Sequence, residues 1–159
     1  MEYNKLGRGS GAPYGGIDGD SASGAETCCL ISALTDVPIA QSMAMTGAID
    51  QHGRIQAIGG VNEKIEGFFE VCKAKGLTGD QAVLIPASNV GNLVLRQEVV
   101  DAVKQGQFNV YAIETVEQGI EILTGVPAGD IDGKGNYPTG SINARVVETL
   151  EEMRPGIFD

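Results

Sequence analysis

Helical and extended patterns alternate along the chain after residue 60, and this alternation constrains the fold more than any other feature of the sequence. The first pattern has apolar side chains at positions i, i+3, i+4 and i+7, which predicts a helix with one buried face. These side chains are Ile65, Phe68, Phe69 and Cys72. Gly76 stands where the C-cap of that helix is expected. The stretch 81–85 reads QAVLI and is followed by Pro86, which is typical of a short, fully buried strand.

The rest of the chain continues this mixture of elements. Thr115 and Gln118 have the spacing of a capping box, so a helix is expected to begin there and to end at Gly125. The stretch 22–34 consists almost entirely of small and apolar residues, which predicts a helix buried on most sides. The remaining predictions are strands at 43–49, 54–58 and 108–113, a hairpin turn at 50–53, a helical piece at 98–104, a short helix capped by Ser88, and a last helix from Ser141 to about Met153 with Val146, Leu150 and Met153 on one face. The predicted fold class is α+β, a mixed sheet with helices packed on it.

A length of 159 residues fits one domain with a hydrophobic core of its own, because domains usually contain roughly 100–200 residues. Residues 1–13 are rich in glycine and poor in apolar side chains. We interpret them as a linker or a non-native head and place the folded domain at 14–159.

The charge and the cysteine content limit the partners and the compartment. The formal net charge is −10, whereas nucleic acids and anionic membrane surfaces bind basic proteins. The sequence has no apolar run near the ~18 residues of a membrane span and no signal-peptide pattern. The three cysteines, Cys28, Cys29 and Cys72, are an odd set with an adjacent pair, which favours a reducing, cytoplasmic location over a disulfide framework. A single histidine, His52, excludes a site with several imidazole ligands.

A candidate nucleophile lies in the stretch 19–25, which reads GDSASGA and joins a glycine turn to the start of the first predicted helix. The first amide groups of a helix have no intrahelical acceptor and favour negative charge. An oxyanion formed when Ser21 attacks a carbonyl group would therefore be stabilised there. Serine and aspartate are also preferred N-caps, so Ser21 or Asp20 could have that structural role instead.

A nucleophilic serine needs a base, and two residues are candidates. His52 lies in the predicted turn at 50–53, where a solvent-exposed side chain is expected. Lys64 lies in the first turn of the second helix, where the positive field of the helix N-terminus and apolar neighbours such as Phe68 favour a neutral amine. A neutral amine is a competent general base. The alternative is a solvated lysine without a catalytic role.

Four motifs follow one another in a fixed order. They are GDSAS at 19–23, AMTG at 44–47, IGGVNEK at 58–64 and LIP at 84–86. Through these motifs the chain resembles the proteolytic domain of the Lon protease family, the ATP-dependent serine–lysine peptidases, and most closely its type-B branch. Thr46 follows Ser21 by 25 residues and Lys64 follows it by 43, which fits the family. The resemblance covers about residues 14–125.

This resemblance implies a role for each matching residue. Ser21 would be the nucleophile, Lys64 the general base and Thr46 a supporting hydrogen-bonding residue. Asp18 would have a conformational role near the oxyanion hole, and Asp20 belongs to the nucleophile motif. The amide of Ser21 would donate one hydrogen bond to the oxyanion. The implied reaction is hydrolysis of peptide bonds in unfolded or damaged polypeptides through an acyl-enzyme.

Two features depart from the family pattern. Family members carry several strands before the serine motif, whereas 20 residues precede Ser21 here, so we expect a truncated or replaced N-terminal part. The sequence also lacks a phosphate-binding P-loop motif. We therefore expect no cofactor in this chain, with ATP and Mg²⁺ acting only through an ATPase module on absent sequence or on another chain. The resemblance further implies a homohexameric ring.

The acidic stretch at 130–133 is expected to be a polar turn rather than a calcium loop.

Three functions remain open for this sequence. The first is an ATP-dependent-type serine endopeptidase domain with a dyad of Ser21 and Lys64. The second is a catalytically inactive fragment of the same family that acts as an assembly module. The third is a small-molecule binding domain with a glycine-rich anion site at Ser21 or at residues 59–60.

Overall fold

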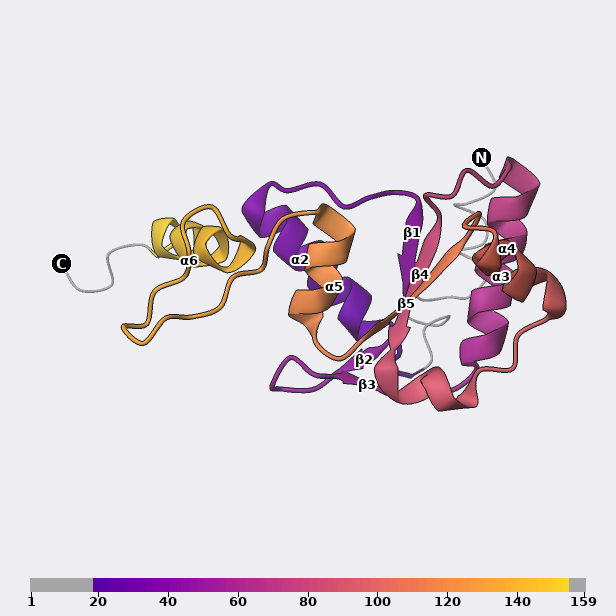
Figure 1. Ribbon diagram of the computed structural model, residues 1–159. Coiled ribbons are helices and arrows are strands. Elements are labelled where there is room, and N and C mark those ends of the chain that lie inside the picture. Colours follow the sequence, from indigo (N-terminus) through magenta and orange to yellow (C-terminus); the bar gives the residue numbers. More distant parts are fainter. Residues whose placement is uncertain (1–18, 155–159) are drawn as a thin grey trace, which may run out of the picture.

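The computed structural model describes residues 19–154. Three parallel strands lie at the centre in the order β1-β4-β5: β1 (Met43–Met45), β4 (Ala82–Pro86) and β5 (Asn109–Ile113). A separate antiparallel hairpin contains β2 (Ala48–Ile49) and β3 (Ile55–Gln56). The helical elements are α2 (Ser23–Thr35), α3 (Val61–Lys75), η1 (Ala87–Asn92, a 3₁₀ helix), α4 (Gln97–Lys104), α5 (Val116–Thr124) and α6 (Ile142–Glu152) (Figure 1). Helices with both parallel and antiparallel strand pairs confirm the predicted α+β class.

Strand β4 is buried along its whole length and contributes to two hydrophobic cores. Successive side chains of a strand point to opposite faces, so Leu84 packs into one core while Val83 and Ile85 pack into the other. The first core joins β4 to α2 and α5, and the second joins it to α3 and α4. Figure 1 accordingly shows α2 and α5 on one side of the strands and α3 and α4 on the other.

The helix predicted from the apolar stripe is confirmed as α3. Ile65, Phe69 and Cys72 are buried, and Phe68 at the edge of the stripe is half-buried. The ring of Phe69 meets that of Phe108 edge-on, with centroids 5.3 Å apart. Full burial of a phenylalanine side chain stabilises the fold by about 1.5–3 kcal/mol, which anchors α3 to the sheet.

Several predicted boundaries are also confirmed. Gly76 and Gly125 are the C-caps of α3 and α5 and have positive φ angles, as glycine allows. The hydroxyl of Ser141 caps α6 by accepting the amide of Ala144 at 3.2 Å. The hydroxyl of Thr115 caps α5 in the same way. Strand β4, helix α4 and strand β5 match the predictions at 81–85, 98–104 and 108–113 within one residue.

The predicted strand at 43–49 is wrong as a continuous element. It divides into β1 and β2 because Gly47 turns away from the sheet to meet the start of α2. The amide of Gly47 donates to the carbonyl oxygen of Ser21 at 2.8 Å, and its own carbonyl accepts from Gly24 at 3.0 Å. The return strand predicted at 54–58 shortens to β3, and the hairpin turn between β2 and β3 is confirmed.

The expectation that the first helix is buried on most sides is wrong. Gly24, Cys28 and Thr35 are the buried residues of α2, whereas Leu30 is 66% exposed. Helices α5 and α6 pack against α2 and leave Leu30 uncovered.

One smaller prediction is also wrong. Ser88 does not cap a helix, since η1 begins after Pro86 and has no side-chain cap. The helix predicted from Ser141 to about Met153 is confirmed as α6. Of the three side chains predicted on one of its faces, Val146 packs against the first core, whereas Leu150 and Met153 are 51% and 61% exposed. Helix α6 lies beyond α2 at one end of the structure (Figure 1), so its buried anchor is Ile142 in its first turn.

Candidate active site

Three elements bring Ser21, Thr46 and Lys64 together. Ser21 lies in the turn before α2, Thr46 directly follows β1, and Lys64 is in the first turn of α3. The Nζ of Lys64 lies 2.7 Å from the Oγ of Ser21 and 3.2 Å from the Oγ1 of Thr46. Two elements from opposite sides of the sheet thus contribute a hydroxyl and an amine to one cluster.

The hydroxyl of Thr46 orients this cluster. Its Oγ1 donates to the carbonyl oxygen of Ser21 at 3.2 Å, so its remaining oxygen lone pairs accept from Lys64. A neutral amine has two N–H groups and one lone pair. At the observed distances, a neutral amine in this place would direct one N–H to Thr46 and its lone pair to the hydroxyl hydrogen of Ser21. Thr46 is 8% exposed, which keeps competing water away from its hydroxyl group.

The backbone around Ser21 is fixed by contacts with the end of β1. Its carbonyl oxygen accepts the amide of Gly47 at 2.8 Å as well as the hydroxyl of Thr46. The amide of Thr46 donates to the carbonyl oxygen of Leu84 at 3.0 Å, which ties this end of β1 to β4. The central strands therefore hold both Ser21 and Thr46.

The structure rejects the capping interpretation of Ser21 and Asp20. Helix α2 has Ala22 as its N-cap and no side-chain cap. The side chain of Ser23 fixes this turn instead, since its Oγ donates to the carbonyl oxygen of Asp20 at 2.8 Å and accepts the amide of Ile49 at 3.0 Å. The Oγ of Ser21 is left to interact with Lys64.

The remaining predicted residues lie apart from this cluster or outside the described range. His52 is exposed in the turn between β2 and β3, and no hydrogen bond joins it to Ser21 or Lys64. Asp20 is exposed and contributes its backbone carbonyl to the turn before α2. Asp18 lies outside residues 19–154, so its predicted role is untested.

A pocket of about 230 Å³ opens beside the hydroxyl–amine pair. Its lining combines Ser21, Thr46 and Lys64 with the apolar side chains of Ala22, Ala44, Met45, Phe68 and Val83. The polar groups lie together and apolar surface surrounds them, which is the usual composition of a site for a small group or a side chain.

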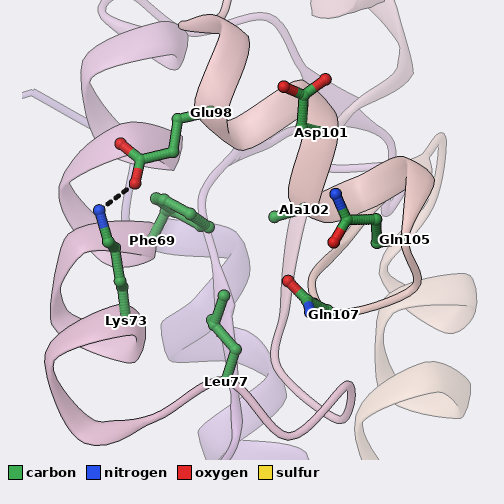
Figure 2. Close-up of a pocket in the computed structure, with 8 residues that line it drawn as sticks. All are labelled: Phe69, Lys73, Leu77, Glu98, Asp101, Ala102, Gln105 and Gln107. Atoms are coloured by element: carbon green, nitrogen blue, oxygen red, sulfur yellow. Dashed lines mark hydrogen bonds and ion pairs between the residues drawn. The ribbon is translucent and has the colours of Figure 1, made fainter.

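A second pocket of about 440 Å³ lies between α3 and α4 (Figure 2). Lys73 and Glu98 form an ion pair across it, and the hydrogen bond to Glu98 raises the pKa of Lys73. Phe69 and Leu77 form its apolar wall. None of the predicted site residues lines this pocket, so it is separate from the candidate active site.

Two residues near the site were missed by sequence reasoning. Asn89 is buried, and its side-chain amide forms two hydrogen bonds with the backbone of Ile58. Asn62, at the start of α3, bonds in a similar way to the backbone of Asn92 and Val94, at and just after the end of η1. The sequence does show two asparagines in the stretch 89–92, close behind a buried strand, but the hydrogen-bond partner of Asn89 is Ile58, 31 residues away.

The turn at 130–133 is a polar turn, as expected. Asp132 accepts the amides of Lys134 and Asn136 at 2.8 Å each, and these bonds lower its pKa.

The comparison with known families matches residues 11–125, a range that contains Ser21, Thr46 and Lys64. The matching family model describes the C-terminal proteolytic domain of Lon protease (S16). The chain belongs to this family. The resemblance inferred from the four sequence motifs is thereby confirmed, and a peptidase function follows for the family domain.

Curated Lon relatives cover most of this chain. A putative Lon protease homolog of Escherichia coli (strain K12) is 54% identical over 110 residues, which are 69% of this chain and 19% of the relative. A putative Lon protease homolog of Haemophilus influenzae is 52% identical over 138 residues, 87% of this chain and 23% of the relative. The archaeal Lon protease of Methanothermobacter thermautotrophicus is 36% identical over 108 residues, 68% of this chain and 15% of the relative. The chain therefore spans about a fifth of the length of the first two relatives.

Within residues 19–154, no helix combines the length and the hydropathy that crossing a bilayer requires.

Proposed function

We propose that this domain is a serine peptidase in which Ser21 is the nucleophile and Lys64 the general base. One observation carries the proposal, the distance of 2.7 Å between the Nζ of Lys64 and the Oγ of Ser21. A general base must lie about 2.6–3.2 Å from the oxygen whose proton it removes. Lys64 meets this requirement, and His52, the other candidate base, does not contact Ser21.

Acylation begins when neutral Lys64 removes the hydroxyl proton of Ser21. The Oγ then forms a bond to the carbonyl carbon of the peptide, and the carbonyl oxygen becomes an oxyanion. Protonated Lys64 returns the proton to the departing amine as the C–N bond breaks. A water molecule then attacks the acyl-enzyme, with Lys64 again taking a proton. Lys64 returns this proton to the Oγ of Ser21 as the ester C–O bond breaks, which releases the acid and restores the free enzyme.

Stabilisation of the oxyanion is assigned to backbone amides at the start of α2. The amide of Ser21 has no backbone acceptor within hydrogen-bond distance among residues 19–154, so it can donate to a bound oxyanion. Thr46 supports the reaction by holding both partners, since it contacts Lys64 and the carbonyl oxygen of Ser21.

The wider function follows from the family and stands as part of the proposal. The substrates would be unfolded or damaged polypeptides, and the domain would assemble as a homohexameric ring in the cytoplasm. Free cysteines fit a reducing compartment of that kind. ATP and Mg²⁺ would act through an ATPase module outside these 159 residues.

Covalent labelling tests the proposal on the full chain. An alkyl fluorophosphonate is expected to modify Ser21, as located by peptide mass spectrometry, and Ser21→Ala should abolish the modification while the fold survives. Ser88→Ala, which removes an exposed serine far along the chain, is the matched control and should be labelled like the wild type. Labelling at another serine would reject the proposed nucleophile.

The second candidate function is an inactive assembly module. It is favoured by the exposed apolar side chains of Leu30 on α2 and of Leu150 and Met153 near the end of α6, which would suit a protein interface. The same labelling experiment separates the two functions, because an assembly module would carry no reactive serine.

A further inference from the structure

We infer that Asn89 and Asn62 are positioning residues that hold the Lys64 end of helix α3 at its distance from Ser21; this inference rests on the proposed role of Lys64 as base. Asn89 is 4% exposed. Its Oδ1 accepts the amide of Ile58 at 2.9 Å, and its Nδ2 donates to the carbonyl oxygen of Ile58 at 3.0 Å. One side chain thus satisfies both backbone groups of Ile58, the last residue before the two glycines that lead into α3.

Glycine has the widest choice of backbone conformations and no side chain to restrict it. Two successive glycines therefore need contacts from other residues to define the turn, in which Gly60 has a φ of +68°. The carbonyl oxygen of Gly60 nevertheless accepts the amide of Lys64 at 3.1 Å. The orientation of the Gly60 peptide therefore determines where the backbone of Lys64 begins.

Asn62 fixes the other flank of the glycine pair. Its Oδ1 accepts the amide of Val94 at 2.9 Å, and its Nδ2 donates to the carbonyl oxygen of Asn92 at 3.2 Å. Both asparagines thus connect the glycine turn to one segment, residues 87–94, which directly follows β4.

This connection gives Lys64 and Thr46 a common support. Strand β4 carries the segment 87–94 at its carboxyl end, and the carbonyl oxygen of its Leu84 accepts the amide of Thr46 at 3.0 Å. Lys64 itself is exposed, with a long and flexible side chain, so its backbone must be held if the amine is to reach Ser21 reproducibly. A displacement of a catalytic group by about 1 Å can lower a reaction rate roughly 100-fold. We expect a loss of up to this size in the reaction of Ser21 when the two asparagines no longer hold the backbone of Lys64.

The test measures the rate constant for fluorophosphonate labelling of Ser21 from neutral to alkaline pH, on full-length variants. Asn89→Ala is expected to lower this rate constant by about 10- to 100-fold, because the amine of Lys64 is no longer held at hydrogen-bond distance from the hydroxyl of Ser21. The pH profile of the rate constant should be displaced as well, because the contacts of the Lys64 amine change. Asn89→Asp keeps an acceptor for the amide of Ile58 and loses the donor to its carbonyl, so its rate constant should be intermediate. Asn62→Ala should change the profile in the same direction as Asn89→Ala.

Asn109→Ala is the matched control. Asn109 also forms two side-chain bonds to backbone, with the carbonyl oxygens of Gly79 and Gln81 at 2.8 and 3.3 Å, but at the opposite end of β4. Its loss should lower the Tm and leave the labelling rate constant and pH profile of the folded protein at wild-type values.

Each outcome decides the inference. A folded Asn89→Ala chain with the wild-type pH profile would overturn it, as would an Asn109→Ala chain with the same displacement as Asn89→Ala. If Asn89→Ala does not fold, wild-type profiles in both Asn89→Asp and Asn62→Ala would overturn it. A wild-type chain that is not labelled at Ser21 would overturn the proposed function and this inference together, whereas a labelled wild type beside an unaffected Asn89→Ala rejects the positioning role alone.

Discussion

The amide of Gly24 donates a hydrogen bond to the carbonyl oxygen of Gly47 at 3.0 Å, so the first turn of α2 rests directly on the backbone between β1 and β2. A Cβ on Gly24 would lie 2.9 Å from that oxygen, 3.0 Å from Met45 Cε and 3.2 Å from Ile55 Cδ1. This close approach brings the turn that carries Ser21 to the end of β1.

Gly24→Ala is therefore expected to force α2 away from β1. The free energy of unfolding should fall by about 1–3 kcal/mol, as for other overpacked sites, and labelling of Ser21 should slow. Urea unfolding and fluorophosphonate labelling measure the two effects.

Gly67→Ala is the matched control. A Cβ on Gly67 of α3 meets nothing within 4 Å, so that variant should gain about 0.5–1 kcal/mol. A Gly24→Ala chain as stable and reactive as the wild type would contradict the close packing described here.

Lys64→Arg should abolish peptide cleavage, because a guanidinium group stays protonated and cannot act as a base. The expected loss is about 10²- to 10⁴-fold, measured with a fluorogenic peptide. Lys75→Arg, at the other end of α3, and His52→Ala, in the β2–β3 turn, are controls with expected wild-type rates. Near-normal turnover of Lys64→Arg would remove Lys64 from the mechanism.

The cysteines should differ sharply in reactivity. Burial, with smaller contributions from the charges of Cys29 and Glu117, raises the pKa of Cys28 to about 11, and burial also raises the pKa of Cys72. Since the thiolate is the reactive form, iodoacetamide at mildly alkaline pH should modify exposed Cys29 first. Mass spectrometry should find Cys28 and Cys72 modified only in unfolded chains, and a Cys29→Ser variant should stay unmodified while folded. Equal rates of iodoacetamide modification at Cys28 and Cys29 would argue against the burial of the Cys28 side chain.

The β2–β3 turn should lose order in acid. The amides of Arg54 and His52 donate to the carboxylate of Asp50, and these bonds lower its pKa. Because this pKa is lower in the folded state than in the unfolded state, the carboxylate contributes its full stabilisation at pH values above the ordinary pKa of an aspartate. The contribution is lost as the pH falls through the pKa of the folded state. Hydrogen exchange should show protection of both amides lost on acidification, and at neutral pH in Asp50→Ala. Asp80→Ala, whose side chain accepts no hydrogen bond from a described residue, should retain it.

The site could be predicted from the sequence to the extent that its chemistry lies in short motifs. Local patterns indicate Ser21 and Lys64, and the resemblance to the Lon family adds Thr46; the structure brings these three side chains together. Local patterns also located α3 and β4, because an apolar stripe and an apolar run are properties of neighbouring residues.

Features that depend on distant backbone partners could not be predicted in this way. The break between β1 and β2 arises because Gly47 bonds to Ser21 and Gly24, and nothing in the stretch 43–49 indicates those partners. Asn89 was missed for the same reason, since its role depends on Ile58. The exposure of Leu30 was missed because composition reports how apolar a helix is and not which of its sides is covered.

The alternating side chains of β4 make the pairing of Ser21 with Lys64 depend on the integrity of the whole fold. Leu84 belongs to the core that supports the helix after Ser21, whereas Val83 and Ile85 belong to the core that supports the helix of Lys64. Unfolding of the part of the domain around either core would separate the hydroxyl of Ser21 from the amine of Lys64, even if the part around the other core stayed folded. Under the proposed function, a copy of this domain with one half unfolded would therefore lose the reactivity of Ser21 even though the other half keeps its structure.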